Sequence, residues 1–98
     1  MRPYRWDPEK NDTLAASRGV AFDRTVAAIE NGGLLDDLEH PNPEKYPHQR
    51  VMVVVVEGYA YTVPYVEDVD HLFLKTVFPS RSYTRTYLRD DGQRRESR

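Results

Sequence analysis

A run of apolar residues followed by a turn signal and a second alternating run most constrains how this chain can fold. Residues 51–56 read Val-Met-Val-Val-Val-Val, and such a mostly β-branched run is typical of a strand buried on both faces. Glu57 and Gly58 have the length and composition of a tight hairpin turn. Residues 59–66 then alternate larger and smaller side chains, which predicts the second strand of the hairpin. With 98 residues, the chain has apolar material for one sheet covered on one side by helices, and no room for a second domain.

A short strand at residues 4–6 and two helices are predicted before the hairpin. Asp7 and Pro8 have the residue types of an N-cap and a first helical position, and Gly19 is suited to end that helix after about residue 18. A second helix over residues 22–30 places Phe22, Val26 and Ile29 on one side. We expect a weak strand at residues 34–38, and the three prolines within residues 40–49 predict a loop.

A third strand and a last helix are predicted after the hairpin. Residues 72–78 alternate in the manner of a strand, so that Lys75 points away from Leu72 and Leu74. Pro79 ends this strand, and Ser80 is suited to cap a helix over residues 81–89. The predicted fold is α+β, with two N-terminal helices packed on a small, mainly antiparallel sheet and a short C-terminal helix. Residues 1–90 form one domain, and residues 91–98 are expected to be a mobile basic tail.

Charge is distributed unevenly along the chain. The formal net charge is −2, but residues 81–98 carry +3 and residues 1–80 carry −5. This asymmetry favours a local cationic site, or a basic tail held by an acidic partner, over a general nucleic-acid coat. The chain has no cysteine, which excludes disulfides and thiolate metal sites. Because no signal-peptide core or long apolar stretch is found, we expect a soluble, cytoplasmic protein that does not enter a membrane.

Cationic and aromatic residues gather in the sequence around the last predicted helix. Arg81 and Arg85 share one helix face, as do Tyr83 and Tyr87, and the preceding strand brings Lys75 toward them. One concavity could therefore hold all five side chains and bind a phosphate-bearing ligand. Cleaving RNA through its own 2′-hydroxyl requires a proton acceptor, a cation for the phosphate and a proton donor for the leaving oxygen. In the alternative interpretation, the arginines are solvated and the tyrosines pack onto the sheet.

Further candidate contacts lie at Arg89, at His48 and in a tyrosine stripe. Arg89 follows on the same helix, and His48 could approach the ligand if its loop folds over the open face of the sheet. His40, His48 and His71 show no recognised ligand spacing, so we expect no metal and no cofactor, although a metal-assisted hydrolase that uses this histidine loop remains an alternative. The stripe formed by Tyr59, Tyr61 and Tyr65 could stack bases, but ordinary packing explains it more simply.

Several short strings resemble the BrnT family of type II toxins, which belongs to the RelE-like superfamily. The shared positions are Trp6-Asp7, Lys10-Asn11, Leu14, Arg18-Gly19 and Phe22, together with Pro79-Ser80-Arg81 before the last helix. The resemblance spans roughly residues 4–38 and 50–88. The family often has an acidic residue in its last helix, whereas residues 83–87 contain none, and the loop at residues 40–49 has no counterpart.

The resemblance implies a RelE-like fold and a ribonuclease that works without metal and blocks translation. It also implies a ribbon-helix-helix antitoxin as partner, through which the pair would contact operator DNA. By position, Arg81 corresponds to the active-site arginine of the family, while Arg85 and Tyr87 fall in its active helix. Lys75 is added from strand geometry alone. The alternative is a catalytically silent module of the same fold that binds an antitoxin or nucleic acid.

Overall fold

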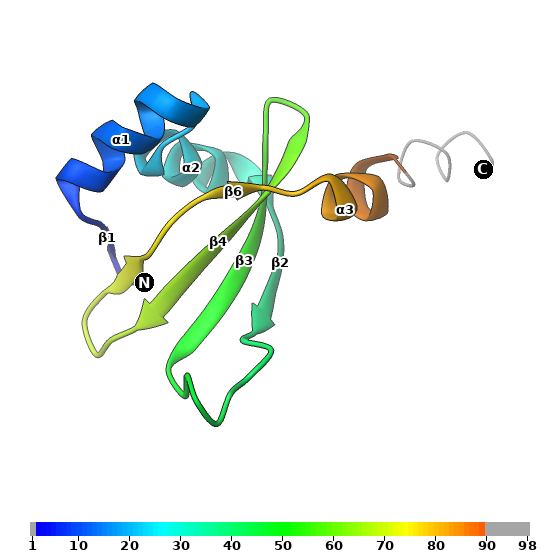
Figure 1. The fold of residues 1–98 in the computed structure, drawn as a ribbon. Coiled ribbons are helices and arrows are strands. Elements are labelled where there is room, and N and C mark those ends of the chain that lie inside the picture. Colours follow the sequence, from blue (N-terminus) through cyan, green and yellow to red (C-terminus); the bar gives the residue numbers. More distant parts are fainter. Residues whose placement is uncertain (1, 90–98) are drawn as a thin grey trace.

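A computed structural model describes residues 2–89 and shows an α+β chain built on a six-stranded mixed sheet (Figure 1). The strands are β1 (Tyr4–Arg5), β2 (Leu34–Glu39), β3 (Gln49–Val56), β4 (Tyr59–Glu67), β5 (Leu72–Leu74) and β6 (Phe78–Pro79). The helices are α1 (Pro8–Arg18), α2 (Phe22–Ala28) and α3 (Arg81–Tyr83). Wider π-type turns follow α2, as η1 (Ile29–Gly33), and α3, as η2 (Thr84–Arg89). We call α3 and η2 together the terminal helix.

The predicted arrangement of two N-terminal helices on a small, mainly antiparallel sheet is wrong. The expected short strand, β1, precedes both helices, but it pairs in parallel with β5, with Tyr4 opposite Leu72. The sheet order is β1-β5-β4-β3-β2, and β6 also pairs with β4. A parallel pair needs a long crossover connection, and here α1, α2 and the β2–β4 segment together form it. The RelE-like arrangement that we expected is therefore not the one observed. The expected tail at residues 91–98 lies outside the described residues.

The central hairpin of β3 and β4 is as predicted. The two strands pair without interruption from Gln49 opposite Val66 to Val56 opposite Tyr59. Glu57 and Gly58 both have positive φ angles, 51° and 80°, which is the geometry of a type I′ turn. This turn matches the twist of the flanking strands, so the long apolar run of β3 becomes the centre of the sheet.

One face of the hairpin carries the core and lies against α1 and α2. Cross-strand pairs point to the same side of a sheet, so Met52, Val54 and Val56 share a face with Val63 and Tyr65. These five side chains are at most 5% exposed and pack with buried side chains of both N-terminal helices, Leu14 and Phe22. We call this the core face.

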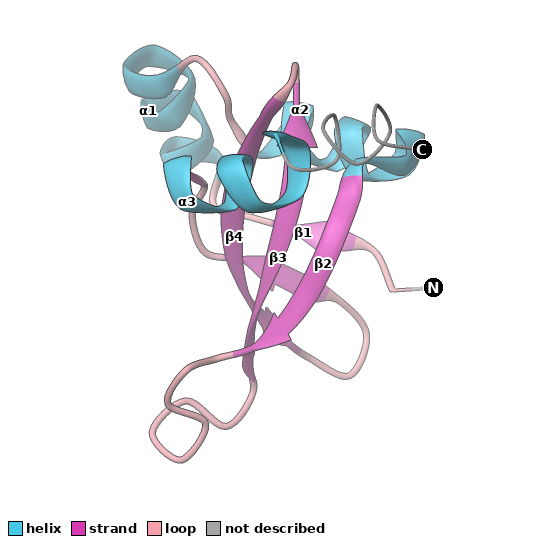
Figure 2. Cartoon of the chain, turned by 90° about the vertical axis from the view of Figure 1, so that its right-hand side faces the viewer, coloured by secondary structure: helices cyan, strands magenta, loops and turns pink. Residues whose placement is uncertain are grey.

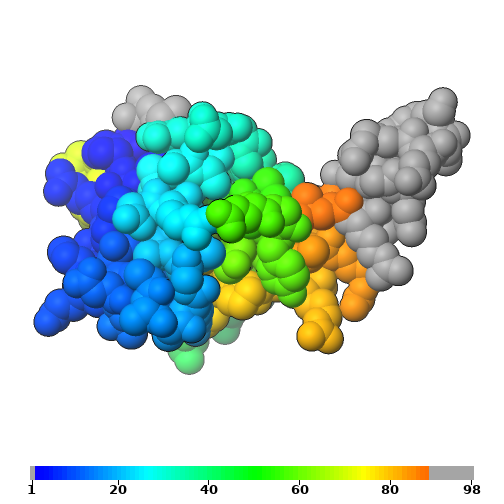
Figure 3. Space-filling view, turned by 90° about the horizontal axis from the view of Figure 1, so that it is seen from above, coloured from blue at the N-terminus to red at the C-terminus, as the bar shows by residue number. Residues whose placement is uncertain are grey.

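The opposite face, which we call the site face, is covered at one end by the terminal helix (Figure 2). It carries Val53, Val55, Ala60 and Thr62. Val53 and Ala60 are fully buried there although they lie outside the main core cluster. Seen from above, the β3–β4 turn lies between the N-terminal helices and the terminal helix (Figure 3). The hairpin is thus buried on both faces at this end, as its composition predicted.

The single strand predicted over residues 72–78 is divided in two by a β-bulge. Leu74 of β5 pairs with Tyr65, but Phe78 of β6 pairs with Thr62. The pairing of β6 with β4 is therefore shifted by one residue relative to the pairing of β5 with β4. The break occurs opposite Pro64, which accepts a hydrogen bond from the Lys75 amide at 2.8 Å but has no N–H to donate in return. The bulge reverses the alternation, so Val77 is buried and Phe78 pairs on the site face.

The first N-terminal helix, α1, begins and ends as its cap residues predict. The Asp7 carboxylate accepts a hydrogen bond from the Glu9 amide at 3.0 Å, and Gly19 ends α1 with φ of 75°. The Asn11 side chain accepts from the Phe22 amide at 2.8 Å, which joins α1 to the start of α2. Within residues 2–89, no helix combines the length and the apolar character needed to cross a membrane.

Gly33 sets the position at which β2 leaves the N-terminal helices. A Cβ atom there would lie 2.8 Å from the backbone oxygens of Ala28 and Val55. We therefore expect Gly33→Ala to lower the free energy of unfolding by about 1–3 kcal/mol, as in other overpacked sites, measured by urea denaturation. Gly58→Asn is the control, because a Cβ there meets open space and asparagine tolerates positive φ. Equal stabilities for the two variants would contradict this account of Gly33.

Candidate functional site

The terminal helix is fixed to the outer edge of β4 through Ala60. The Ala60 carbonyl accepts from the Ser80 amide at 2.9 Å, and the Ala60 amide donates to the Thr84 hydroxyl at 2.8 Å. Thr84 in turn donates to the Ser80 carbonyl at 2.7 Å. The Ser80 side chain accepts from the Tyr83 amide at 3.1 Å, which confirms its predicted role as N-cap. The start of the helix is thus held by both backbone and side-chain hydrogen bonds.

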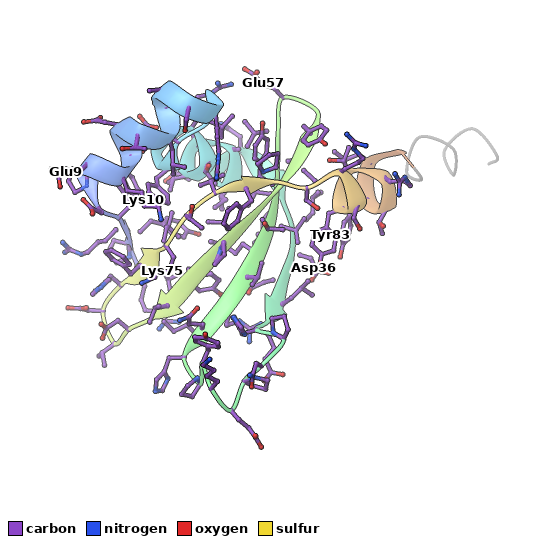
Figure 4. The ribbon with its side chains drawn as sticks, viewed as in Figure 1. Glu9, Lys10, Asp36, Glu57, Lys75 and Tyr83 are labelled. Atoms are coloured by element: carbon purple, nitrogen blue, oxygen red, sulfur yellow. The ribbon has the colours of Figure 1, made fainter. Side chains whose placement is uncertain are left out.

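Two tyrosines of the terminal helix meet a carboxylate of β2. The rings of Tyr83 and Tyr87 lie with their centroids 5.7 Å apart. The Tyr87 hydroxyl donates to Asp36 Oδ2 at 2.6 Å. Figure 4 shows Tyr83 and Asp36 on the side of the molecule that the terminal helix occupies. This bond joins residues 51 positions apart, so it brings the edge strand β2 into the site.

The hydrogen bond affects both titratable groups in opposite directions. It is the main reason that the pKa of the Asp36 carboxyl is lowered and that the pKa of the Tyr87 phenol is raised. At neutral pH the carboxylate is therefore ionised and the phenol keeps its proton. Because that proton is directed at Asp36, the remaining lone pairs of the Tyr87 oxygen are available as acceptors.

Three arginines of the terminal helix were predicted to bind phosphate. The structure describes the side chains of two of them, and both are exposed. Arg81 and Arg85 are open to solvent, and neither forms an ion pair with another of the described side chains. Exposed guanidinium groups without a carboxylate partner are suited to binding phosphate oxygens. The side chain of Arg89, the third predicted arginine, lies outside what the structure describes.

Lys75 does not join the arginines in one concavity. Its amide bonds to Pro64 on β4, whereas Ser80, next to Arg81, bonds to Ala60. Those two β4 positions are four residues apart, or about 13 Å at the usual strand rise of ~3.3 Å. Figure 4 likewise places Lys75 well away from Tyr83. The Lys75 ammonium lies 5.9 Å from the ring centroid of Phe73, which pairs on the site face. Lys75 and the terminal helix therefore lie toward opposite ends of the same face.

Sequence reasoning missed three residues at this face: Phe78 and Asp36 on its strands, and Arg18 of α1, which contacts Phe78. Phe78 is 43% exposed between the two cationic ends, and the Arg18 guanidinium lies 4.9 Å from its ring centroid. Arg18 also donates to the Val77 carbonyl. Simple alternation along the strand places Phe78 on the core face, whereas the bulge brings it to the site face. Asp36 is the third, and its signal was present: in a strand, adjacent Asp36 and Asp37 must point to opposite faces.

The neighbouring carboxylate, Asp37, has a structural role on the core face. Both of its oxygens accept from the Tyr65 hydroxyl, at 2.9 and 2.8 Å, and Arg50 Nε lies 3.0 Å from Oδ1. Burial, and then the bond to Asp37, raises the pKa of the Tyr65 phenol. Tyr61 packs against the same core. Tyr61 and Tyr65 of the β4 stripe thus follow the packing interpretation.

His48 lies at the far end of β4 from the terminal helix. Its carbonyl accepts from the Glu67 amide at 2.9 Å, and its side chain lines an open hollow with Arg2, Val66 and Val69. His40 packs on Tyr46 in the loop, with ring centroids 4.5 Å apart. Among residues 2–89, no three histidine or acidic side chains are placed to hold a metal ion together. His48 therefore lies apart from the terminal helix, beside the opposite end of β4.

The site face thus offers a row of groups suited to an extended, phosphate-bearing chain. Cations lie at both ends, aromatic rings lie between and beside them, and an ionised carboxylate with a bound phenol lies under the terminal helix. Comparison with models of protein families, with curated proteins and with solved structures finds no match to this chain.

Thr84 tests how the helix is held. Thr84→Val keeps the side-chain shape but leaves the fully buried Ala60 with an amide that has no acceptor. We expect a loss of about 1–3 kcal/mol in the free energy of unfolding, together with faster proteolysis after residue 80. Thr86→Val is the matched control, since Thr86 is exposed on the same helix. A Thr84→Val protein as stable as this control would show that the Ala60 bond does not hold the helix.

Proposed function

We propose that this chain is the toxin of a type II toxin–antitoxin pair and that it acts on RNA through the site face. The observation that supports this most is the fixed terminal helix, which presents Arg81 and Arg85 to solvent beside the Tyr83–Tyr87 ring pair. Guanidinium groups bind phosphate bidentately, and tyrosine rings stack on unpaired bases. The resemblance of residues 79–81 and of the N-terminal strings to BrnT toxins gives the proposal its biological context.

In this proposal RNA lies along the site face as a single strand. Arg81 stabilises the phosphate at the cleaved position, and Arg85 binds a neighbouring phosphate. Phe78 and Tyr83 offer surfaces on which bases stack, which is how single strands are usually held. Lys75, about 13 Å along β4 at ~3.3 Å per residue, contacts the backbone farther along the strand. In this proposal the role of Lys75 is therefore to bind RNA.

The reaction we propose is metal-independent cleavage that uses the 2′-hydroxyl of RNA as nucleophile. Such a reaction needs positioning, charge stabilisation and proton transfer, and protein side chains alone can supply all three. Arg81 supplies the charge stabilisation, and Tyr87 is the group of the terminal helix able to take part in proton transfer.

A second candidate is a catalytically silent module that binds RNA or an antitoxin. The separation of Lys75 from Arg81 favours it, since the cations form an extended surface rather than a closed catalytic pocket. In either case we propose a ribbon-helix-helix antitoxin as partner, with operator DNA bound through that antitoxin.

Arg81→Ala tests the active-site assignment. We expect expression of the parent chain without an antitoxin to arrest growth, and the variant to lose this effect because the phosphate charge is no longer stabilised. Arg24→Ala is the control, since Arg24 pairs with Glu57 at the hairpin turn and not on the site face. Growth arrest by Arg81→Ala equal to that of the parent would remove Arg81 from the mechanism.

RNA binding separates the two candidates. With purified protein and a labelled single-stranded RNA, Arg85→Ala and Lys75→Ala should each weaken binding and reduce the salt slope by about 1. A parent chain that binds RNA and leaves it uncut, and whose expression is harmless, supports the silent module.

A further inference from the structure

We infer that Asp36 is a positioning residue of the proposed ribonuclease: it orients the Tyr87 hydroxyl as the acceptor for the 2′-hydroxyl proton of RNA and takes the phenolic proton in return. This inference rests on the proposed function. It adds a residue from the edge strand β2 to a site otherwise built from the terminal helix and the β4 edge.

Geometry supports this role. The distance from the Tyr87 oxygen to Asp36 Oδ2 is 2.6 Å, which is typical of a charge-assisted bond between a hydroxyl and a carboxylate and shorter than most bonds between neutral oxygens. Both side chains are partly exposed, so a ligand can reach the phenol. The Asp36 side chain points to the site face because it pairs with Val53, while Asp37 pairs with Met52 on the core face.

The pair also supplies the acidic group that the terminal helix itself lacks. Residues 81–89 contain arginine, tyrosine, serine, threonine and leucine, and no carboxylate. With the phenolic proton directed at Asp36, Tyr87 accepts hydrogen bonds from a ligand and does not donate them. A proton arriving at the Tyr87 oxygen must displace the first proton, and Asp36 is the hydrogen-bonded group that receives it.

The proposed step balances as follows. The 2′-oxygen forms a bond to phosphorus while its proton passes to the Tyr87 oxygen and the phenolic proton of Tyr87 passes to Asp36 Oδ2. The bond from phosphorus to the 5′-oxygen breaks, which leaves a 2′,3′-cyclic phosphate and a 5′-oxygen that takes a proton from water. Asp36 then releases its proton to water, so the protein returns to its starting state and no metal or redox partner is consumed.

Asp36→Asn tests the relay with little change in structure, because the amide oxygen of asparagine still accepts a hydrogen bond from Tyr87. The full-length chain is assayed with a labelled single-stranded RNA, both free and in a translation extract, and an all-deoxy strand serves as the uncleavable reference. We expect the variant to cleave about 100-fold more slowly, the scale of one general base. Tyr87→Phe should lose about as much, and the double variant little more, because the two residues act as a unit.

The pH dependence separates a relay from a merely structural clamp. In the parent, the pKa of Asp36 is lowered below its ordinary value of about 3.9 and that of Tyr87 is raised above about 10. The parent rate should therefore be nearly constant from about pH 5 to 9. In Asp36→Asn the proton has no internal acceptor, so hydroxide must take it and the rate should rise about tenfold per pH unit.

Asp70→Asn is the matched control. The Asp70 carboxyl also has a lowered pKa, caused mainly by its hydrogen bond to His71 at 2.7 Å, but it lies in the loop between β4 and β5. The Asp70→Asn variant should therefore cleave RNA at the parent rate. If the parent cuts RNA and Asp36→Asn keeps its rate and flat pH profile, the relay is wrong and the proposed function stands. If the parent cuts neither free nor translated RNA, the ribonuclease fails and the relay fails with it.

Discussion

The hydrogen bonds made by the amide and the carbonyl of Ala60 determine where the terminal helix lies, and the site face depends on that position. Ala60 is fully buried and presents only a methyl group, so the segment from Ser80 to Thr84 can approach the strand closely. Its amide and carbonyl are both used by that segment. From this anchor the helix reaches β2 at Tyr87 and Asp36. A larger side chain at position 60 would separate helix and sheet, and the arginines would lose their fixed place.

The parts of the fold that were predictable from sequence are those set by local chemistry. The hairpin follows from a β-branched run and a two-residue turn, and the helix starts at Asp7 and Ser80 follow from side chains that cap their own backbone. The sheet order does not follow from local signals. The two residues of β1 pair with Leu72 and Phe73, far along the chain, and a strand of two residues has too little periodicity to identify its partner.

The candidate residues of the terminal helix were predictable from sequence, but the strand residues that surround the helix were not. The spacing of Tyr83 and Tyr87, and the exposure of Arg81, agree with the helical pattern. Lys75 was assigned to the same concavity because alternation gives the face of a strand but not the distance along it. The bulge opposite Pro64 then changed which side chains share that face, since one extra residue reverses the alternation that follows. Asp36 was absent from the predicted site because its partner is 51 positions away.

Adjacent carboxylates with different partners on opposite faces make β2 sensitive to length as well as to composition. Asp36 meets the terminal helix and Asp37 meets Tyr65 and Arg50, and a register irregularity between Leu34 and Asp36 sets which is which. Removing that irregularity would exchange the two positions without altering any side-chain chemistry. In a chain that keeps both aspartates but has one residue more or fewer before them, the two carboxylates would exchange faces and partners. Sequence identity at these two positions would therefore not show that their contacts are the same.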